Sequence, residues 1–489
     1  MPVASPLGAV ELAAGLPILV VAIAAVAVML LIALRRHHGL TAGMTAAGLA
    51  LALILLPIVG PAAPRRITSL LTVDPYALFY SGLMLATSLG VTILSYGYFA
   101  QRRGQREELY LLLLLATLGA LVLVASTHFV SFVIGLELLS VSLFGLIAYS
   151  VTAEESIEAG VKYLVLAGMA SALLLFGMAL VYAATGSMDL LRLAEMLSAP
   201  GRTVADAYVL GGIVLIIAGV GFKLSLVPFH MWAPDIYQGA PAPITAFIAT
   251  VSKGATFALL LRYFYQADLY RYPVLTLVLS AIAAASILVG NLLALRQQNL
   301  KRLLAYSSIA HMGYALVAFL AGGRFAVEAV TYYLLAYFVM NLGAFGVIAI
   351  LSPPDSMRDL DRTEDYRGLF WRRPWLAGAL SGMLLALAGV PLTVGFVAKF
   401  YALAAGVAAS LWVLAVILVI GSVIGLYYYL RVIVVMFRPL PQAVDPGIAA
   451  APSRLQFGQS ALMAVLSLML VWLGVYPAPV IALIQSTGL

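Results

Sequence analysis

The sequence predicts an all-α polytopic membrane protein of about 14 transmembrane helices, with two inverted five-helix repeats and two discontinuous helices. Three observations carry this prediction. The 489 residues are 64% hydrophobic and 10% charged, which leaves too few polar residues to cover a water-soluble surface. The apolar runs are continuous rather than alternating, which favours helices over a β-barrel. Two prolines, Pro228 and Pro391, interrupt apolar runs 163 residues apart, which suggests a duplicated unit.

The individual spans follow from charge breaks and from Gly/Pro punctuation, since a helix needs about 20 apolar residues to cross a bilayer. Candidate spans are centred near residues 23, 50, 86, 117, 138, 170, 217, 251, 284, 312, 338, 388, 421 and 471. The first apolar run, roughly residues 13–34, is too long for a signal peptide and lacks a basic segment before it. We therefore expect it to be retained as a span.

The repeat divides the chain into four segments. The starts of the fourth and ninth candidate spans, near Glu108 and Tyr272, lie about 164 residues apart, close to the spacing of the two prolines. Five helices cross the membrane an odd number of times, so successive copies enter from opposite sides. The expected segments are spans 1–3 in residues 1–107, a first repeat in 108–271, a second, inverted repeat in 272–440, and span 14 in 441–489.

Basic residues are distributed unevenly between the two sets of loops. Loops after odd-numbered spans hold 16 lysines and arginines, and loops after even-numbered spans hold seven. By the positive-inside rule the odd loops face the cytoplasm, which predicts that both termini are periplasmic. The net charge of +7 therefore indicates topology rather than nucleic acid binding. The largest polar connection, residues 352–373, is expected to be a solvated loop that contacts a neighbouring chain.

The absence of cysteine excludes several kinds of redox site. Without cysteine the chain cannot hold an iron–sulfur cluster, a thiolate metal site or a disulfide. The sequence also lacks a glycine-rich dinucleotide loop that follows a strand. Any redox chemistry is expected to take place in another subunit.

Lysine is rare and is placed where charge is costly. Five lysines stand against 22 arginines, and Lys223, Lys253 and Lys399 interrupt apolar runs. A desolvated lysine can lose its proton near neutral pH, whereas arginine stays charged. Lys223 lies five residues before Pro228 and Lys399 eight after Pro391, and broken helices carry the ion site in inverted-repeat transporters. This pattern predicts a membrane proton carrier.

Glu137 lies at the middle of the fifth span, and Lys253 lies near the centre of the eighth. One acid and three lysines within spans cost on the order of 10 kcal/mol, which water, pairing or neutralisation must offset. Glu137 is expected to influence Lys223, and through Lys223 to influence Lys253. A buried Glu137–Lys223 ion pair that only fixes helix packing is the alternative.

Other candidates are less specific. His311, in the tenth span, could relay protons between Lys253 and Lys399 or be structural, and His230 could cap the broken helix or feed the relay. Lys399 could instead extend to the interface if the helix is unbroken at Pro391. Lys162 and Lys301 are expected to lie at the interface.

Three stretches carry a family resemblance. VPFHMWAPDIYQGAPAP (227–243), NLKRLLAYSSIAHMGY (299–314) and LAGVPLTVGFVAKFY (387–401) resemble the antiporter-like membrane subunits of bacterial respiratory complex I, and the resemblance extends along nearly the whole chain. That family has a glutamate in span 5, a lysine in span 7, a central lysine in span 8 and an ionisable residue in span 12. The pattern falls on Glu137, Lys223, Lys253 and Lys399. A lysine rather than a glutamate in span 12, and no long lateral helix after span 14, distinguish the branch that the chain resembles.

The resemblance implies a proton-translocating membrane-arm subunit of NADH:quinone oxidoreductase, driven by quinone reduction elsewhere in the complex. NADH, FMN, the iron–sulfur clusters and quinone would be bound by other subunits, with no cofactor in this chain. The implied partners are other membrane subunits and lipids, in a bacterial inner membrane. Glu137, Lys223, Lys253, Lys399, His311 and His230 would form the proton relay with water.

Two alternatives remain open at this point. A subunit of a multisubunit sodium/proton antiporter would share the fold and the lysines but would have no link to electron transfer. A structural membrane scaffold would tolerate apolar residues at the lysine positions without loss of pumping.

Overall fold

The computed structural model describes residues 8–100, 102, 104–150, 153–198, 207–267, 269–353, 359–439 and 456–488. In this part of the chain, twelve helices are long and apolar enough to cross a membrane. They are α2 (Leu16–Leu34), α3 (His38–Val59), α4 (Pro75–Ala100), α5 (Glu108–Ala125), α6 (Phe129–Ile147), α7 (Glu154–Thr185), the continuous α11–η2–α12 (Ala242–Gln266), α13 (Pro273–Leu295), α14 (Leu300–Leu320), α15 (Gly323–Leu351), α19 (Trp412–Phe437) and α21 (Phe457–Val475).

The remaining two predicted spans are interrupted helices. Span 7 consists of α9 (Ala207–Lys223) and α10 (Trp232–Gly239), and span 12 consists of α17 (Pro374–Ala388) and α18 (Val394–Ala408). Each of the 14 predicted centres therefore falls on or beside a helix, which confirms the polytopic all-α fold. The boundaries of the two repeats stay a prediction, and the last of them, at residue 440, lies outside the described residues.

Short elements connect the spans. They are α1 (Ala9–Ala14), η1 (Gly60–Ala62), β1 (Arg65–Arg66), β2 (Thr72–Val73), α8 (Leu190–Ser198), η3 (Leu269–Arg271), η4 (Thr363–Tyr366), α16 (Leu369–Arg372) and α22 (Ala478–Ser486). β1 and β2 pair antiparallel, with Arg65 opposite Val73 and Arg66 opposite Thr72.

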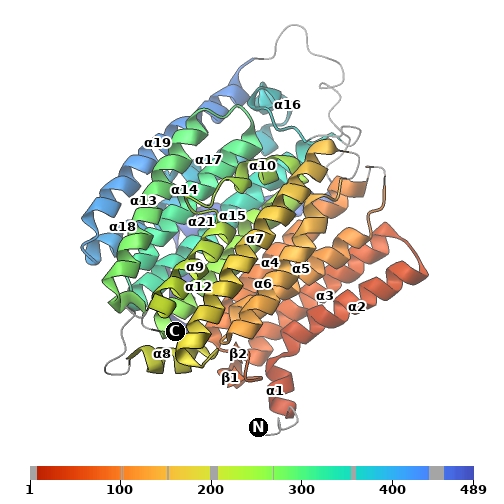
Figure 1. Ribbon diagram of the computed structural model, residues 1–489. Helices are drawn as coiled ribbons and strands as arrows, with labels where there is room; N and C mark the ends of the chain where they lie inside the picture. The colour runs from red at the N-terminus through yellow and green to blue at the C-terminus, as the bar shows by residue number, and fades with distance from the viewer. Residues whose placement is uncertain are drawn as a thin grey trace.

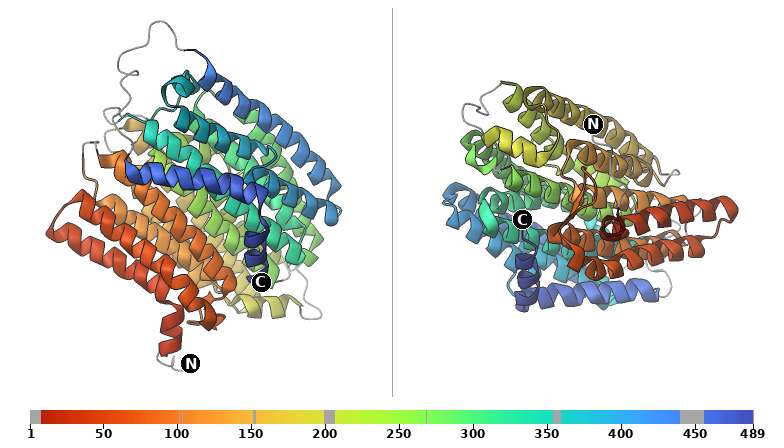
Figure 2. Two further views of the ribbon diagram at one scale, coloured as in Figure 1. Left: turned by 180° about the vertical axis from the view of Figure 1, so that it is seen from behind. Right: turned by 90° about the horizontal axis from the view of Figure 1, so that it is seen from below.

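The long helices lie side by side in a bundle, with α2 and α3 at one edge and α19 at the opposite edge (Figure 1). Both ends of the chain lie at the end of the bundle that carries α1, α8 and the β-hairpin, and α16 lies at the other end (Figures 1 and 2). An even number of spans predicts this arrangement of the termini. α21 crosses the back of the bundle obliquely, in contact with α4, α15, α17 and α18 (Figure 2, left).

The centre of the bundle is formed by three spans that are surrounded by the rest. In α11–η2–α12 the most apolar window is 100% buried, and in α14 and α15 it is 94% buried, against 33% for α2 and 28% for α3. Helices enclosed on every side have no amphipathic stripe, so their place at the centre could not be read from periodicity. The central lysine and His311 lie on these enclosed helices.

At the first interruption, side chains provide hydrogen-bond partners for two backbone groups. α9 ends at Lys223, and the indole N–H of Trp232 donates to the Phe222 carbonyl at 2.8 Å. The Val227 N–H donates to the Ser286 hydroxyl of α13 at 3.0 Å. A helix can break at membrane depth only when its freed polar groups find such partners. The interruption beside Pro228 that the sequence predicts is therefore confirmed.

The second interruption depends on a glycine. α17 ends at Ala388, and Gly389 adopts a left-handed conformation with φ of 87°. A Cβ at Gly389 would lie 2.9 Å from Cδ of Lys399, so only glycine lets the lysine side chain pass over the break. The sequence-predicted break is confirmed, and Lys399 is 7% exposed rather than extended to the interface.

The prediction of an exposed 352–373 connection is wrong for Asp359. Its carboxylate is 3% exposed and forms an ion pair with Lys301 at 2.7 Å, and the Tyr98 hydroxyl donates to it at 2.6 Å. Lys301, which is 1% exposed, also donates to the Ala240 carbonyl at 2.6 Å, so the prediction of an interfacial lysine is wrong as well. The sequence did not predict the ion pair between Lys301 and Asp359, because 58 residues separate them.

We expect Asp359→Asn to loosen this connection. Burial alone would raise the pKa of the Asp359 carboxyl, but the charges of Lys301 and Arg102 hold it below its usual value, so the group is ionised in the folded chain. An amide keeps the shape and removes the charge, which leaves Lys301 without its counter-ion at a cost of about 1–3 kcal/mol. Faster proteolytic cleavage in the 352–373 connection of membrane-embedded protein would show the effect. Glu364→Gln in the same connection is the control, and equal cleavage of the two variants would contradict the prediction.

Candidate functional site

Four buried basic side chains lie on helices of the two repeats and of the core. Lys223 is the last residue of α9, Lys253 is the first of α12, His311 lies within α14, and Lys399 lies within α18. Their exposed fractions are 3%, 0%, 2% and 7%, respectively. The structure therefore places all four sequence-predicted basic groups inside the bundle, where each charge needs polar partners.

Lys253 is the deepest of them, and hydroxyl groups surround it. Its Nζ donates to Ser308 Oγ at 2.5 Å and lies 5.4 Å from the centre of the Tyr237 ring. Ser308 also accepts from the Tyr337 hydroxyl at 2.6 Å. A π-helical turn, Ile248–Ser252, immediately precedes Lys253. Such turns often mark functional positions in helices, because the extra residue changes the direction of the side chains that follow.

His311 lies one turn further along α14 from Ser308. Its Nδ1 is hydrogen-bonded to the Tyr333 hydroxyl at 2.7 Å, and its Nε2 lies 3.4 Å from the Tyr429 hydroxyl. The Tyr429 hydroxyl also forms a short hydrogen bond with Ser307. Both ring nitrogens of His311 therefore face hydroxyl groups, which can accept and donate protons in turn.

Lys399 occupies the far end of this polar region. Its Nζ donates to Ser422 Oγ at 2.7 Å and to the Ala388 carbonyl at 2.9 Å, the last carbonyl of α17. The ammonium group lies 5.0 Å from the centre of the Tyr314 ring, and that ring contacts the His311 ring with centroids 5.5 Å apart. The helix break thus supplies a ligand for the lysine, as the position of Pro391 suggested.

The environment of Lys223 differs from the expected one. Its Nζ donates to Ser140 Oγ at 2.6 Å and lies 5.4 Å from the centre of the Tyr163 ring. Among the described residues, no ion pair within 4.0 Å joins Lys223 to Glu137, which lies one turn before Ser140 on α6. The expected influence of Glu137 on Lys223 therefore does not involve a direct ion pair.

His230 lies in the segment between α9 and α10. The side chain is 7% exposed, and its Nδ1 has no hydrogen-bond partner within the described part of the chain. Its carbonyl accepts the Ala233 N–H at 3.0 Å at the start of α10. The backbone of His230 thus contributes to the broken end, whereas no direct contact of the ring supports a part in the relay.

Neither section of the row is continuous among the described residues. Between Lys253 and Lys399, Lys253 is hydrogen-bonded to Ser308 and His311 to Tyr333, but no side-chain hydrogen bond of the described residues joins these two groups to each other or to Lys399. Between Lys223 and Lys253, no side-chain hydrogen bonds among the described residues form an unbroken link. Water would have to complete both sections, since water commonly bridges polar groups that lie more than about 3.5 Å apart.

Comparison with known proteins identifies the family. Residues 126–425 match the family described as NADH:quinone oxidoreductase/Mrp antiporter, transmembrane. NADH-quinone oxidoreductase subunit N of Nitrosospira multiformis is 52% identical over 474 residues, with 94% of this chain and 93% of the relative covered. The same subunit of Ectopseudomonas mendocina is 48% identical, with 98% and 97% covered. The chain belongs to the subunit N family of NADH-quinone oxidoreductase.

Solved structures agree with membership of the subunit N family. A chain of respiratory complex I from Thermus thermophilus with bound aureothin matches with a TM-score of 0.79 at 33% identity, over 95% of this chain and 98% of that one. A chain of an Mrp complex from a Dietzia species matches with a TM-score of 0.85 at 20% identity, over 97% of both chains. The second match shows the fold alone. The prediction that the chain belongs to the branch of the family with a lysine rather than a glutamate in span 12 is confirmed, because the relatives are named subunit N.

Sequence reasoning missed several members of the site. Ser140, Ser308 and Tyr337 hold or extend the lysine contacts. Ser308 stands three residues before His311, so one helix face could have been expected to carry both. Arg262 was also given no role: it lies within α12, is 0% exposed, and is paired with Asp74.

Proposed function

We propose that this chain translocates protons across the membrane as the subunit N of a bacterial NADH:quinone oxidoreductase, driven by quinone reduction in other subunits. The observation that carries the proposal is the row of buried basic groups, Lys223, Lys253, His311 and Lys399, each with hydroxyl or carbonyl partners. Three desolvated lysines inside one bundle are costly, and a purely structural protein has no reason to keep them.

The proposed roles follow the positions of the groups. Glu137 tunes Lys223 across Ser140, and Lys253 receives the proton and passes it towards Ser308 and His311. Lys399 then delivers it at the second helix break, towards the periplasmic side. His230 joins the relay only through water, since its ring makes no direct link. A lysine can serve here because it releases a proton when desolvated, which arginine does not.

The partners are inferred from the family and from the surface of α6. The relatives are named as subunits of NADH-quinone oxidoreductase, so this chain would assemble with other membrane subunits. Glu137 is partly exposed, between Ile134 (53% exposed) and Val141 (59% exposed) on the same face of α6. A carboxylate at mid-membrane depth does not face lipid, which supports a neighbouring subunit against this face.

The same proposal assigns the redox chemistry to other subunits of the complex. NADH, FMN, the iron–sulfur clusters and quinone would be bound by other subunits of the complex, and the chain is an enzyme only as part of that assembly. By the positive-inside rule, the distribution of lysine and arginine supports periplasmic termini in a bacterial inner membrane. A sodium/proton antiporter subunit is the alternative, but the chain shares 48–52% identity with subunits N and only 20% with the Mrp chain.

The experiment for this proposal compares Lys399→Ala with Lys399→Arg in the assembled complex. Both are expected to lower NADH-driven proton uptake into inverted vesicles about tenfold or more, because neither side chain can take up and release a proton. Uptake by the wild-type complex should not require sodium. If arginine restored pumping, Lys399 would be needed only for its charge. Dependence of uptake on sodium would favour the antiporter alternative.

A further inference from the structure

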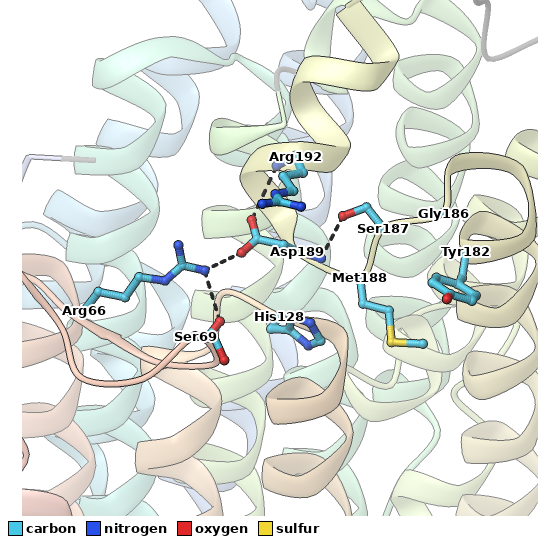
Figure 3. A pocket seen from close by; sticks show the side chains of 9 residues that line it. All are labelled: Arg66, Ser69, His128, Tyr182, Gly186, Ser187, Met188, Asp189 and Arg192. Atoms are coloured by element: carbon cyan, nitrogen blue, oxygen red, sulfur yellow. Dashed lines mark hydrogen bonds and ion pairs between the residues drawn. The ribbon is translucent and has the colours of Figure 1, made fainter. Parts of the chain in front are cut away.

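A polar pocket lies at the end of the bundle that carries α8 and the β-hairpin, away from the proposed relay (Figures 1 and 3). Its volume is about 640 Å³. Its walls include Arg66 of β1, His128 at the start of α6, Tyr182 in the last turn of α7, and Asp189 and Arg192 at the start of α8. Because α6 begins and α7 ends here, the pocket lies where the phosphate groups of a bilayer lie.

Among the described residues that line the pocket, the one carboxylate, that of Asp189, is already paired. Oδ2 of Asp189 forms a short ion pair with Arg66. Oδ1 accepts the N–H groups of Leu191 at 3.0 Å and Arg192 at 3.4 Å, which caps α8. Burial alone would raise the pKa of Asp189, but Arg66 and the two N–H groups hold it below its usual value. The carboxylate is therefore ionised and fully engaged.

Arg66, Arg192 and His128 supply hydrogen-bond donors on these walls. Nδ1 of His128 accepts the Val130 N–H at 3.1 Å, so the proton of the neutral ring is on Nε2. Burial lowers the pKa of His128, and the charge of Arg66 lowers it further against the opposing effect of Asp189, which keeps the ring neutral. Arg192 adds a positive charge that Asp189 does not offset, since that carboxylate is paired with Arg66. Figure 3 shows Arg66, Arg192 and His128 grouped around Asp189. A pocket of this composition attracts an anion with several acceptor oxygens.

Exposed apolar side chains lie close in sequence to two of the pocket residues. Val130 (39% exposed) follows His128 by two residues on α6, and Leu191 (51% exposed) precedes Arg192 on α8. Tyr182, which is 44% exposed on the pocket wall, presents an aromatic ring at the depth where such rings contact headgroups. The adjoining polar and apolar surfaces fit a ligand with a phosphate at one end and a hydrocarbon chain at the other.

We propose that this pocket binds the phosphate headgroup of an anionic phospholipid, with an acyl chain packed along the adjoining apolar surface. Among the described residues, Arg192 has no ion-pair partner and supplies the charge. The N–H groups of Arg66 that have no partner among the described residues and Nε2–H of His128 supply hydrogen bonds, and Asp189 keeps Arg66 in place. An inorganic phosphate would meet the same donors but would leave the hydrocarbon surface unused. The positive-inside rule places the lipid in the periplasmic leaflet.

The test is photo-crosslinking in the intact complex. A benzophenone amino acid replaces Tyr182, and the complex is reconstituted in phosphatidylcholine vesicles that contain phosphatidylglycerol. We expect an adduct of phosphatidylglycerol that Arg192→Gln lowers about fivefold, as is usual for one basic residue at an anionic membrane surface. Arg192→Lys should retain the adduct. Arg65→Gln is the matched control, because Arg65 neighbours Arg66 on β1 but does not line the pocket.

Three outcomes would overturn the proposal. Equal adducts from phosphatidylcholine and phosphatidylglycerol would show a site without charge selectivity. Competition by inorganic phosphate would show a site for a free anion. An adduct to a neighbouring subunit in place of lipid would show that protein covers the pocket.

Discussion

Replacing Lys253 with alanine is expected to abolish proton uptake driven by NADH and to lower quinone reduction with it. Lys253 is fully buried at the centre of the bundle, and its Nζ donates to Ser308. Loss of a positioned proton carrier costs about a hundredfold or more, and a coupled complex cannot continue electron transfer at full rate when its proton path is closed. The measurement is proton uptake into inverted vesicles beside quinone reductase activity.

Two further variants make the Lys253 result specific. Lys253→Met keeps the length of the side chain and fills the same space, so it separates loss of the amine from the creation of a cavity. Lys162→Ala removes a lysine whose side chain is 43% exposed and is expected to leave both rates unchanged. Assembly is checked by recovery of the intact complex. Pumping and electron transfer at wild-type rates in an assembled Lys253→Ala complex would remove the relay proposal and favour the structural scaffold.

The sequence was sufficient to predict the spans, the two breaks and the burial of Lys223, Lys253 and Lys399, because each depends on one dominant physical cost. Charge in hydrocarbon is expensive, and proline removes a helix hydrogen bond, so Lys253 and Pro391 are conspicuous in any apolar run. Gly389 extends the same argument, since its left-handed conformation ends α17. Each of these features depends on one or a few neighbouring residues in the sequence, so it can be recognised without knowledge of the fold.

The partners of the charges could not be predicted, because they depend on which helices become neighbours. Lys301 meets Asp359 across 58 residues, and Lys223 meets Ser140 across 83. Serine is common in membrane helices, so nothing in the sequence marked Ser140 as a partner of Lys223, whereas a glutamate at mid-span such as Glu137 is conspicuous. The sequence therefore predicts an influence of Glu137 on Lys223, whereas the direct contact of Lys223 is with Ser140. The free-energy cost of burying a charge makes a charged residue recognisable in the sequence, but the packing of the helices determines which groups compensate that charge.

The largest loss of stability is expected from Asp74→Asn. Arg262 is 0% exposed, and its guanidinium makes a bidentate contact with Asp74, with Nη1–Oδ2 at 2.6 Å and Nη2–Oδ1 at 2.8 Å. The same carboxylate accepts the Ala77 N–H at 2.7 Å at the start of α4, so the pair joins span 3 to span 8. Removing one charge of such a pair leaves the other buried and uncompensated, which costs about 3–5 kcal/mol.

The effect is measured by heating the purified complex and recording how much of this chain stays bound to it. Glu108→Gln is the matched control, because its ion pair with Arg36 has side chains 32% and 50% exposed and contributes about 1 kcal/mol or less. Combining Asp74→Asn with Arg262→Met removes both charges, and we expect it to recover most of the lost stability, since apolar replacement of a whole buried pair is often neutral. If the double variant were no more stable than Asp74→Asn alone, the loss would come from the cap of α4 rather than from the stranded arginine. If Asp74→Asn did not differ from Glu108→Gln, water would have to reach Arg262, and the helix contact between spans 3 and 8 would not depend on this pair.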